Sequence, residues 1–126
     1  MKKLPDAEFE VMSAVWRLTP PVTSAMLMRE IGRAKGWKAP ALITLINRLI
    51  GRGFLRTEKP GRERAYYPLI ERDAYLRFES ESFLKRYHGG SLTSLMASLT
   101  GADAPLDGQA EALIRWVKER EGGNGL

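Results

Sequence analysis

A helix with one apolar face, followed at once by a basic hairpin, fills the chain between Lys38 and Leu69 and constrains the fold most strongly. Apolar residues recur in the helical part at i, i+3, i+4 and i+7, the spacing of one side of an α-helix. These residues are Leu42, Leu45, Ile46 and Leu49. We expect this side to pack in a core and to leave another side of the helix free to bind a partner.

The free side of this helix carries residues suited to nucleic-acid recognition. Its members are Lys38, Ala41, Thr44, Arg48 and Arg52. Thr44 can meet a base edge or a thymine methyl group, and Arg48 can meet a base or a phosphate. Arg52 is expected to meet phosphate, because it lies at the helix end, where Gly53 can adopt the left-handed cap conformation. Asn47 could either recognise adenine or support the packed side of the helix. For all the residues on the free side, the alternative is an ordinary solvated helix face.

The hairpin is predicted from two short runs rich in aromatic and extended-favouring residues, Phe54 to Lys59 and Arg64 to Pro68, with a turn between them. From Lys38 to Arg64 the chain has seven Lys or Arg residues and two acidic residues. We therefore expect the hairpin, which we call the wing, to bind anions. We expect the wing to bind the DNA backbone or an adjacent minor groove. The alternative is an ordinary solvated hairpin. The residues expected to bind DNA are Lys59, Arg62 and Arg64.

The positive charge is confined to the first part of the chain. Residues 1–72 hold 14 basic and 7 acidic side chains, a net charge of +7, and residues 73–126 hold 6 basic and 8 acidic side chains, a net charge of −2. A basic part beside a mildly acidic one suits a nucleic-acid reader with a separate association module. Uniform basicity would have indicated a coat protein or a membrane-surface peptide.

Several function classes are excluded by residues that the sequence lacks. It has no cysteine, no apolar run long enough to span a bilayer and no apolar stretch after Met1-Lys2-Lys3. Disulfides, cysteine-based metal sites, thiol chemistry and a signal peptide are therefore not expected. His88 stands alone at an expected helix end, where it can interact with the helix dipole. We predict a soluble cytoplasmic protein that is not an enzyme and has no cofactor or metal.

Two more helices and a short strand are expected before the recognition helix. The first helix starts at Leu4-Pro5-Asp6, and the second runs from about Ser24 to Ala34 with Thr23 as its N-cap. Val22 can form a short strand beside the wing. The order helix, helix, turn, helix, hairpin is that of a winged helix-turn-helix. We predict a mostly α fold with a small β-wing and a DNA-binding domain at residues 1–70. The apolar side of the first helix is Phe9, Met12, Val15 and Trp16.

Residues 71–126 are predicted to form a C-terminal helical dimerisation domain. Helices are expected at Glu71 to His88, at Ser91 to Leu99 and after Asp107 as N-cap, with a loop at residues 101–105 and a frayed tail at residues 122–126. These pieces total too few residues to fold comfortably alone, and a second copy of the chain would cover their apolar sides. The residues expected at this homodimer interface are Tyr75, Phe78, Phe83, Tyr87, Leu92, Leu95, Met96, Leu99, Leu113, Ile114 and Val117.

Two other functions are compatible with these patterns. The winged helix could bind a protein or RNA, with the basic tip incidental, and a duplex preference with a steep salt dependence would argue against this. Alternatively, the aromatic residues Tyr75, Phe78, Phe83 and Tyr87 could line a small-molecule pocket and make the protein a direct ligand sensor. A dimer core is the commoner use of such an aromatic stripe.

Four phrases of the sequence resemble the penicillinase-repressor family, whose members include BlaI, MecI and CopY. The resemblance covers nearly the whole chain. It implies a homodimeric winged-helix repressor that binds an inverted-repeat operator in double-stranded DNA, upstream of resistance or metal-homeostasis genes, with occlusion of polymerase as its action. The phrases are Asp6 to Met12 with Val15-Trp16, Thr44 to Leu49 with Gly53-Phe54, Tyr66-Tyr67-Pro68, and Tyr87 to Gly90.

The chain departs from the pattern of this family at three places. β-Lactam-responsive members are cut by a protease at an Asn-Phe bond, and the matching position here is about Ser98-Leu99. Copper-responsive members have a cysteine-rich C-terminus, which this chain lacks. Pro40-Ala41 stands where members often have Lys-Thr. Either the operator read by this chain differs, or the first phosphate contacts come from Lys38 instead. The resemblance leaves open whether release follows from a protease, an unidentified inducer or another route.

Overall fold

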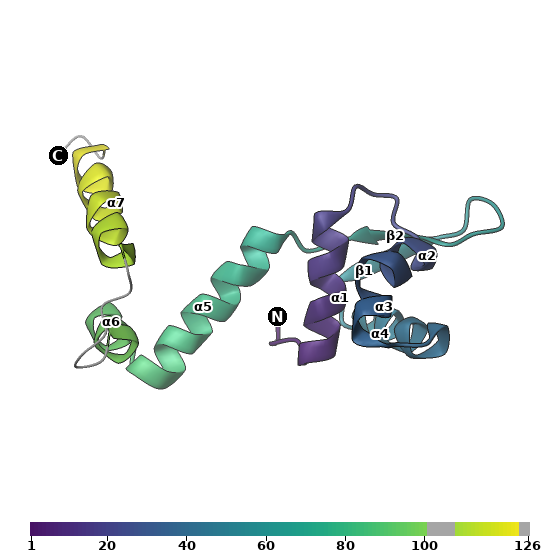
Figure 1. Ribbon diagram of the computed structural model, residues 1–126, viewed down its shortest axis with the longest axis horizontal. Coiled ribbons are helices and arrows are strands. Elements are labelled where there is room, and N and C mark those ends of the chain that lie inside the picture. Colours follow the sequence, from purple (N-terminus) through teal and green to yellow (C-terminus); the bar gives the residue numbers. More distant parts are fainter. Residues whose placement is uncertain (101–107, 124–126) are drawn as a thin grey trace. The chain divides into compact units, whose positions relative to one another are not determined.

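Two units make up the computed structural model, which describes residues 1–100 and 108–123 (Figure 1). The first unit is Met1–Glu79 and the second is Ser80–Leu126. No helix within the described ranges is long and apolar enough to cross a membrane. The elements are α1 (Asp6–Arg17), α2 (Ser24–Leu27), the π-helix η1 (Met28–Gly32), α3 (Arg33–Lys35), α4 (Ala39–Gly51), β1 (Leu55–Glu58), β2 (Ala65–Pro68), α5 (Arg72–His88), α6 (Leu92–Thr100) and α7 (Gln109–Gly123).

The second helix forms as predicted, but with a widened middle turn. α2, η1 and α3 follow one another without a break, and the Thr23 hydroxyl accepts a hydrogen bond from the Met26 backbone N–H at 3.2 Å, as expected of an N-cap. The π turn places Gly32 against Met28. A Cβ at Gly32 would lie 2.5 Å from the Met28 sulfur, so a larger residue at this position would require the Met28 side chain to move. Gly36 then ends the helix with a φ of 71°.

The recognition helix and the wing also form where the sequence predicts them. All four residues of the apolar face of α4 are buried, and Gly53 follows the helix with a φ of 81°. Strands β1 and β2 pair antiparallel, with Leu55 opposite Pro68. Val22 forms the expected bridge to the wing, because its backbone exchanges hydrogen bonds with Tyr66 at 3.1 and 2.7 Å. The wing is therefore fixed to the helices at its base, and the connection between its strands projects away from them (Figure 1).

Tyr75 corrects the expected division of the chain. The sequence places it at the dimer interface, whereas the structure buries it completely in the first unit. Its ring lies 5.5 Å from that of Phe54 and 5.9 Å from that of Trp16, and its hydroxyl accepts a hydrogen bond from the Leu4 backbone N–H at 2.8 Å. Burial, with a smaller contribution from the Glu79 carboxylate, raises the pKa of this hydroxyl to about 12. The first unit therefore extends past residue 70 to Glu79.

The second unit consists of the remainder of α5 with α6 and α7. Gly89 and Gly90 follow α5 with φ values of 57° and 83°, and the Gly90 N–H donates to the Leu84 carbonyl at 3.1 Å. α5 therefore ends at His88, where the sequence predicts the end of this helix. Ser91 caps α6, because its hydroxyl accepts the Ser94 backbone N–H at 3.0 Å. Asp107, expected to cap α7, lies outside the described residues. α7 continues through residues 122 and 123, which were expected to be part of a frayed tail.

Candidate nucleic-acid interface

One side of α4 presents the predicted recognition residues to solvent. Lys38, Ala41, Thr44 and Arg48 are all exposed. Lys38 is the N-cap residue, and the Thr44 hydroxyl donates to the Pro40 carbonyl at 3.0 Å, so its oxygen can still accept a hydrogen bond. Arg48 has no ion pair within the part of the chain that the structure describes. This side can therefore offer a hydroxyl, a methyl and a guanidinium to a DNA groove without first breaking an ion pair.

Arg52 was expected to contact phosphate, but in the structure it contacts Glu8. Its Nε donates to Glu8 Oε1 at 2.7 Å and its Nη2 to Glu8 Oε2 at 3.4 Å. The Glu8 side chain is 2% exposed and the Arg52 side chain is 39% exposed, so a buried carboxylate depends on this guanidinium. The pair ties the end of α4 to the start of α1. Arg52 therefore holds the recognition helix in place, and a phosphate contact by it stays a prediction.

Glu8 is a functional residue that the sequence analysis missed. The signal was present, since Glu8 occupies the first position of an i, i+3, i+4, i+7 row on α1. The other members of that row are Val11, Met12 and Val15, all buried. A carboxylate on an otherwise apolar helix face must find a buried cation or hydrogen-bond donors. The sequence pattern could have indicated that a partner exists, but not that this partner would be Arg52.

The wing tip offers a second set of cations. Lys59, Arg62 and Arg64 are exposed, and none of them forms an ion pair within the residues that the structure describes. Arg64 donates from Nη1 to the Thr57 hydroxyl at 3.5 Å. In contrast, Arg56 on the strand pairs with Glu58 at 2.5 Å and lies 4.1 Å from the Tyr67 ring centre. The tip cations are thus available to phosphate, whereas Arg56 is engaged within the hairpin.

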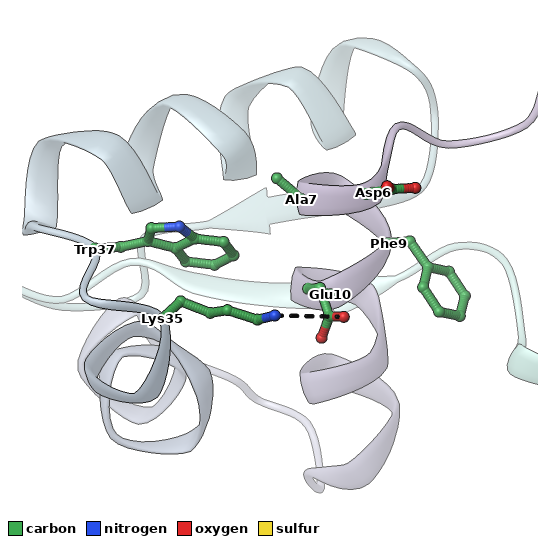
Figure 2. A pocket seen from close by; sticks show the side chains of 6 residues that line it. All are labelled: Asp6, Ala7, Phe9, Glu10, Lys35 and Trp37. Carbon is green, nitrogen blue, oxygen red and sulfur yellow. Dashed lines mark ion pairs between the residues drawn. The ribbon is translucent and has the colours of Figure 1, made fainter.

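The turn that leads into α4 is fastened to α1 (Figure 2). Lys35 reaches across to Glu10, with 3.7 Å between its Nζ and Oε1, and Trp37 lies on the same side of α1. Phe9 points away from Trp37 in this view. The Trp37 backbone N–H donates to the Gly32 carbonyl at 2.9 Å. The start of the recognition helix is therefore held at Lys35 and Trp37, as its end is held at Arg52.

The predicted dimerisation residues fall into two groups. Tyr75 and Phe78 belong to the first unit, where Phe78 packs against the core. This division means that the four aromatic residues considered for a ligand pocket do not line one cavity within either unit. The remaining residues predicted at the dimer interface lie in the second unit. The structure does not describe the side chain of one of them, Val117. Exposed members are Phe83, Tyr87, Leu92, Leu99 and Ile114, and half-buried members are Leu95, Met96 and Leu113.

Comparison with protein families and curated proteins gives concordant matches. The model of the family described as penicillinase repressor matches residues 4–119. The chain is 34% identical over 124 residues to the penicillinase repressor of Bacillus licheniformis, and the match covers 96% of each chain. It is 29% identical over 94 residues to the methicillin resistance regulatory protein MecI of Staphylococcus aureus strain N315, covering 75% of this chain and 76% of that one.

Solved structures match the first part of the chain. The DNA-binding domain of the repressor BlaI superposes with a TM-score of 0.51 at 32% identity, covering 60% of this chain and 94% of that one. The monomeric form of Bacillus licheniformis BlaI in complex with the blaP half-operator superposes with a TM-score of 0.50 at 30% identity, covering 59% and 89%. These matches confirm the predicted winged-helix fold.

Proposed function

Because the chain belongs to the penicillinase repressor family, we propose that it acts as a homodimer on an inverted-repeat operator, with one recognition helix in each half-site. The protein is a DNA-binding transcriptional repressor. Repression by occlusion of polymerase needs no chemistry from the chain itself, and we expect it to act in the cytoplasm. The solved complex of its relative contains a half-operator, which supports a site built from two halves.

The observation that carries this proposal is the pairing of the exposed side of α4 with the free cations of the wing. Thr44 and Arg48 can read base edges in a major groove, because both are exposed and lie one helical turn apart. Lys59 and Arg62 on the projecting tip can neutralise phosphates nearby. Helix-turn-helix dimers place half-sites about one helical turn, roughly 34 Å, apart, which sets the expected operator spacing.

The apolar surface of the second unit supports the proposed dimer. Phe83 is 48% and Tyr87 61% exposed on α5, and Leu92 and Leu99 are more than half exposed on α6. Large apolar side chains that remain exposed together on small helical segments mark an association surface. An identical second copy would cover them and would place two winged helices on one operator.

Selection of bound duplexes from a random DNA pool, together with the mass of the protein in solution, tests the function. We expect enrichment of an inverted repeat by a dimer. Salt-sensitive binding without enrichment, or binding to RNA or protein in its place, would contradict operator recognition and favour a general interaction module. The enriched sequence would also supply the operator for the experiments below.

Arg48→Ala is expected to weaken binding to the selected operator by about 1–3 kcal/mol, because it removes the guanidinium proposed to enter the groove. Titration of a labelled duplex at fixed salt measures this change. Arg77→Ala is the matched control, since Arg77 is also exposed but lies on α5. Equal small losses in both variants would mean that Arg48 contributes only net charge and makes no specific contact.

A further inference from the structure

A groove of about 540 Å³ lies between the recognition helix and the wing, and no role has yet been given to it. Its floor is largely apolar, because Ile43 and Ile50 are half-buried and Tyr66 is 4% exposed. Polar groups stand at its edges. The six residues that line it are Ile43, Asn47, Ile50, Thr57, Arg64 and Tyr66.

Two of the polar side chains that line this groove have hydrogen-bond donors to offer a ligand. The Thr57 hydroxyl donates to the Ala65 carbonyl at 3.2 Å and accepts from Arg64, so it holds the guanidinium beside the groove. Arg64 has no carboxylate partner within 4 Å in the described residues. The Asn47 side chain is exposed and makes no hydrogen bond among the same residues. A guanidinium and an amide N–H₂ therefore line the same groove as the apolar residues.

The shape of duplex DNA determines what should lie there. The major and minor grooves of a duplex are separated by a sugar–phosphate strand. A protein that inserts α4 into a major groove and its wing toward the adjacent minor groove must have that strand pass between the two elements. A deoxyribose offers apolar C–H groups to Ile43 and Ile50, and a phosphate offers acceptors to Asn47 and Arg64. The groove thus matches one DNA backbone segment in both polarity and position.

We propose that this groove clamps one deoxyribose-phosphate strand of each half-site, with Asn47 and Arg64 binding the same phosphate. Asn47 then fixes the register of the recognition helix on the duplex and does not read a base. Ile43 and Ile50 pack against the adjoining sugar. This inference rests on the proposed function, because it requires the winged helix to bind duplex DNA.

The proposal can be tested by neutralising single phosphates in the selected operator with methylphosphonates. With the full-length protein, neutralising the clamped phosphate is expected to weaken binding about tenfold, as loss of charge-assisted hydrogen bonds does. Asn47→Ala and Arg64→Ala should each weaken binding to the unmodified operator. Arg64→Ala should also lose most of its sensitivity to neutralisation at that one position, because it removes the cation. Asn47→Ala should lose part of that sensitivity, because it removes one of the donors to the phosphate.

Arg62→Ala is the control for charge on the wing. Arg62 lies outside the groove lining, so this variant should bind more weakly but keep full sensitivity at the clamped position. Unchanged thermal midpoints would show that the exposed substitutions leave the fold intact. If Asn47→Ala relaxes preference at one base pair, Asn47 reads a base and the clamp is wrong. If wild type binds the operator but no phosphate is coupled to Asn47, the clamp fails while the proposed function stands.

Discussion

Arg52→Ala is expected to lower the free energy of unfolding by about 3 kcal/mol, because it leaves the buried Glu8 carboxylate without its cation. The Glu8 side chain is 2% exposed and both of its oxygens accept from Arg52. Urea or thermal unfolding of the full-length chain, followed by circular dichroism, measures the change.

Two comparisons separate this buried pair from general loss of charge. Arg56→Ala removes an exposed arginine that pairs with Glu58 and should cost less than about 1 kcal/mol. Replacing both Glu8 and Arg52 with methionine should recover much of the stability lost in Arg52→Ala, since no buried charge is then left unpaired. The assignment of Arg52 to the core would be wrong if Arg52→Ala were no more destabilising than Arg56→Ala.

A chain that ends at Glu79 is expected to fold as a monomer and to lose roughly 10²- to 10⁴-fold in apparent affinity for the complete operator. The loss follows from bivalency, because two linked winged helices bind the second half-site as an intramolecular step. Residues 1–79 form a unit of their own in the structure, and the separate DNA-binding domain of the relative BlaI has been solved. Sedimentation and titration against duplexes with one and two half-sites measure both quantities.

The cut must lie after Glu79 and not at residue 70, the boundary expected from the sequence. A chain of residues 1–70 lacks Tyr75 and Phe78, and loss of one large buried aromatic residue costs about 3–5 kcal/mol. Weak DNA binding by this shorter chain would therefore reflect unfolding and could not report on dimerisation. If the 1–79 chain binds the two-site duplex as tightly as the full-length protein, the dimer makes no contribution to operator affinity.

The sequence by itself determined those features that depend on neighbouring residues. The periodicity of α4, the left-handed Gly53 after it, the Thr23 cap and the pairing of the two wing strands all follow from residues within a few positions of one another. Local spacing defines which side of a helix is apolar and where it ends. The exposure of Thr44 and Arg48 followed from the same reasoning.

Only the tertiary structure decided which partner meets each of these surfaces. Arg52 pairs with a residue 44 positions away, and the Tyr75 hydroxyl meets the Leu4 backbone 71 positions away. Helical spacing showed that Tyr75 lies on an apolar face, but an apolar face can be buried by its own chain or by a second copy. The aromatic residues of the first unit bury it, since they lie close enough to fill the space around its ring. The groove beside Asn47 likewise exists only because the wing folds back beside α4.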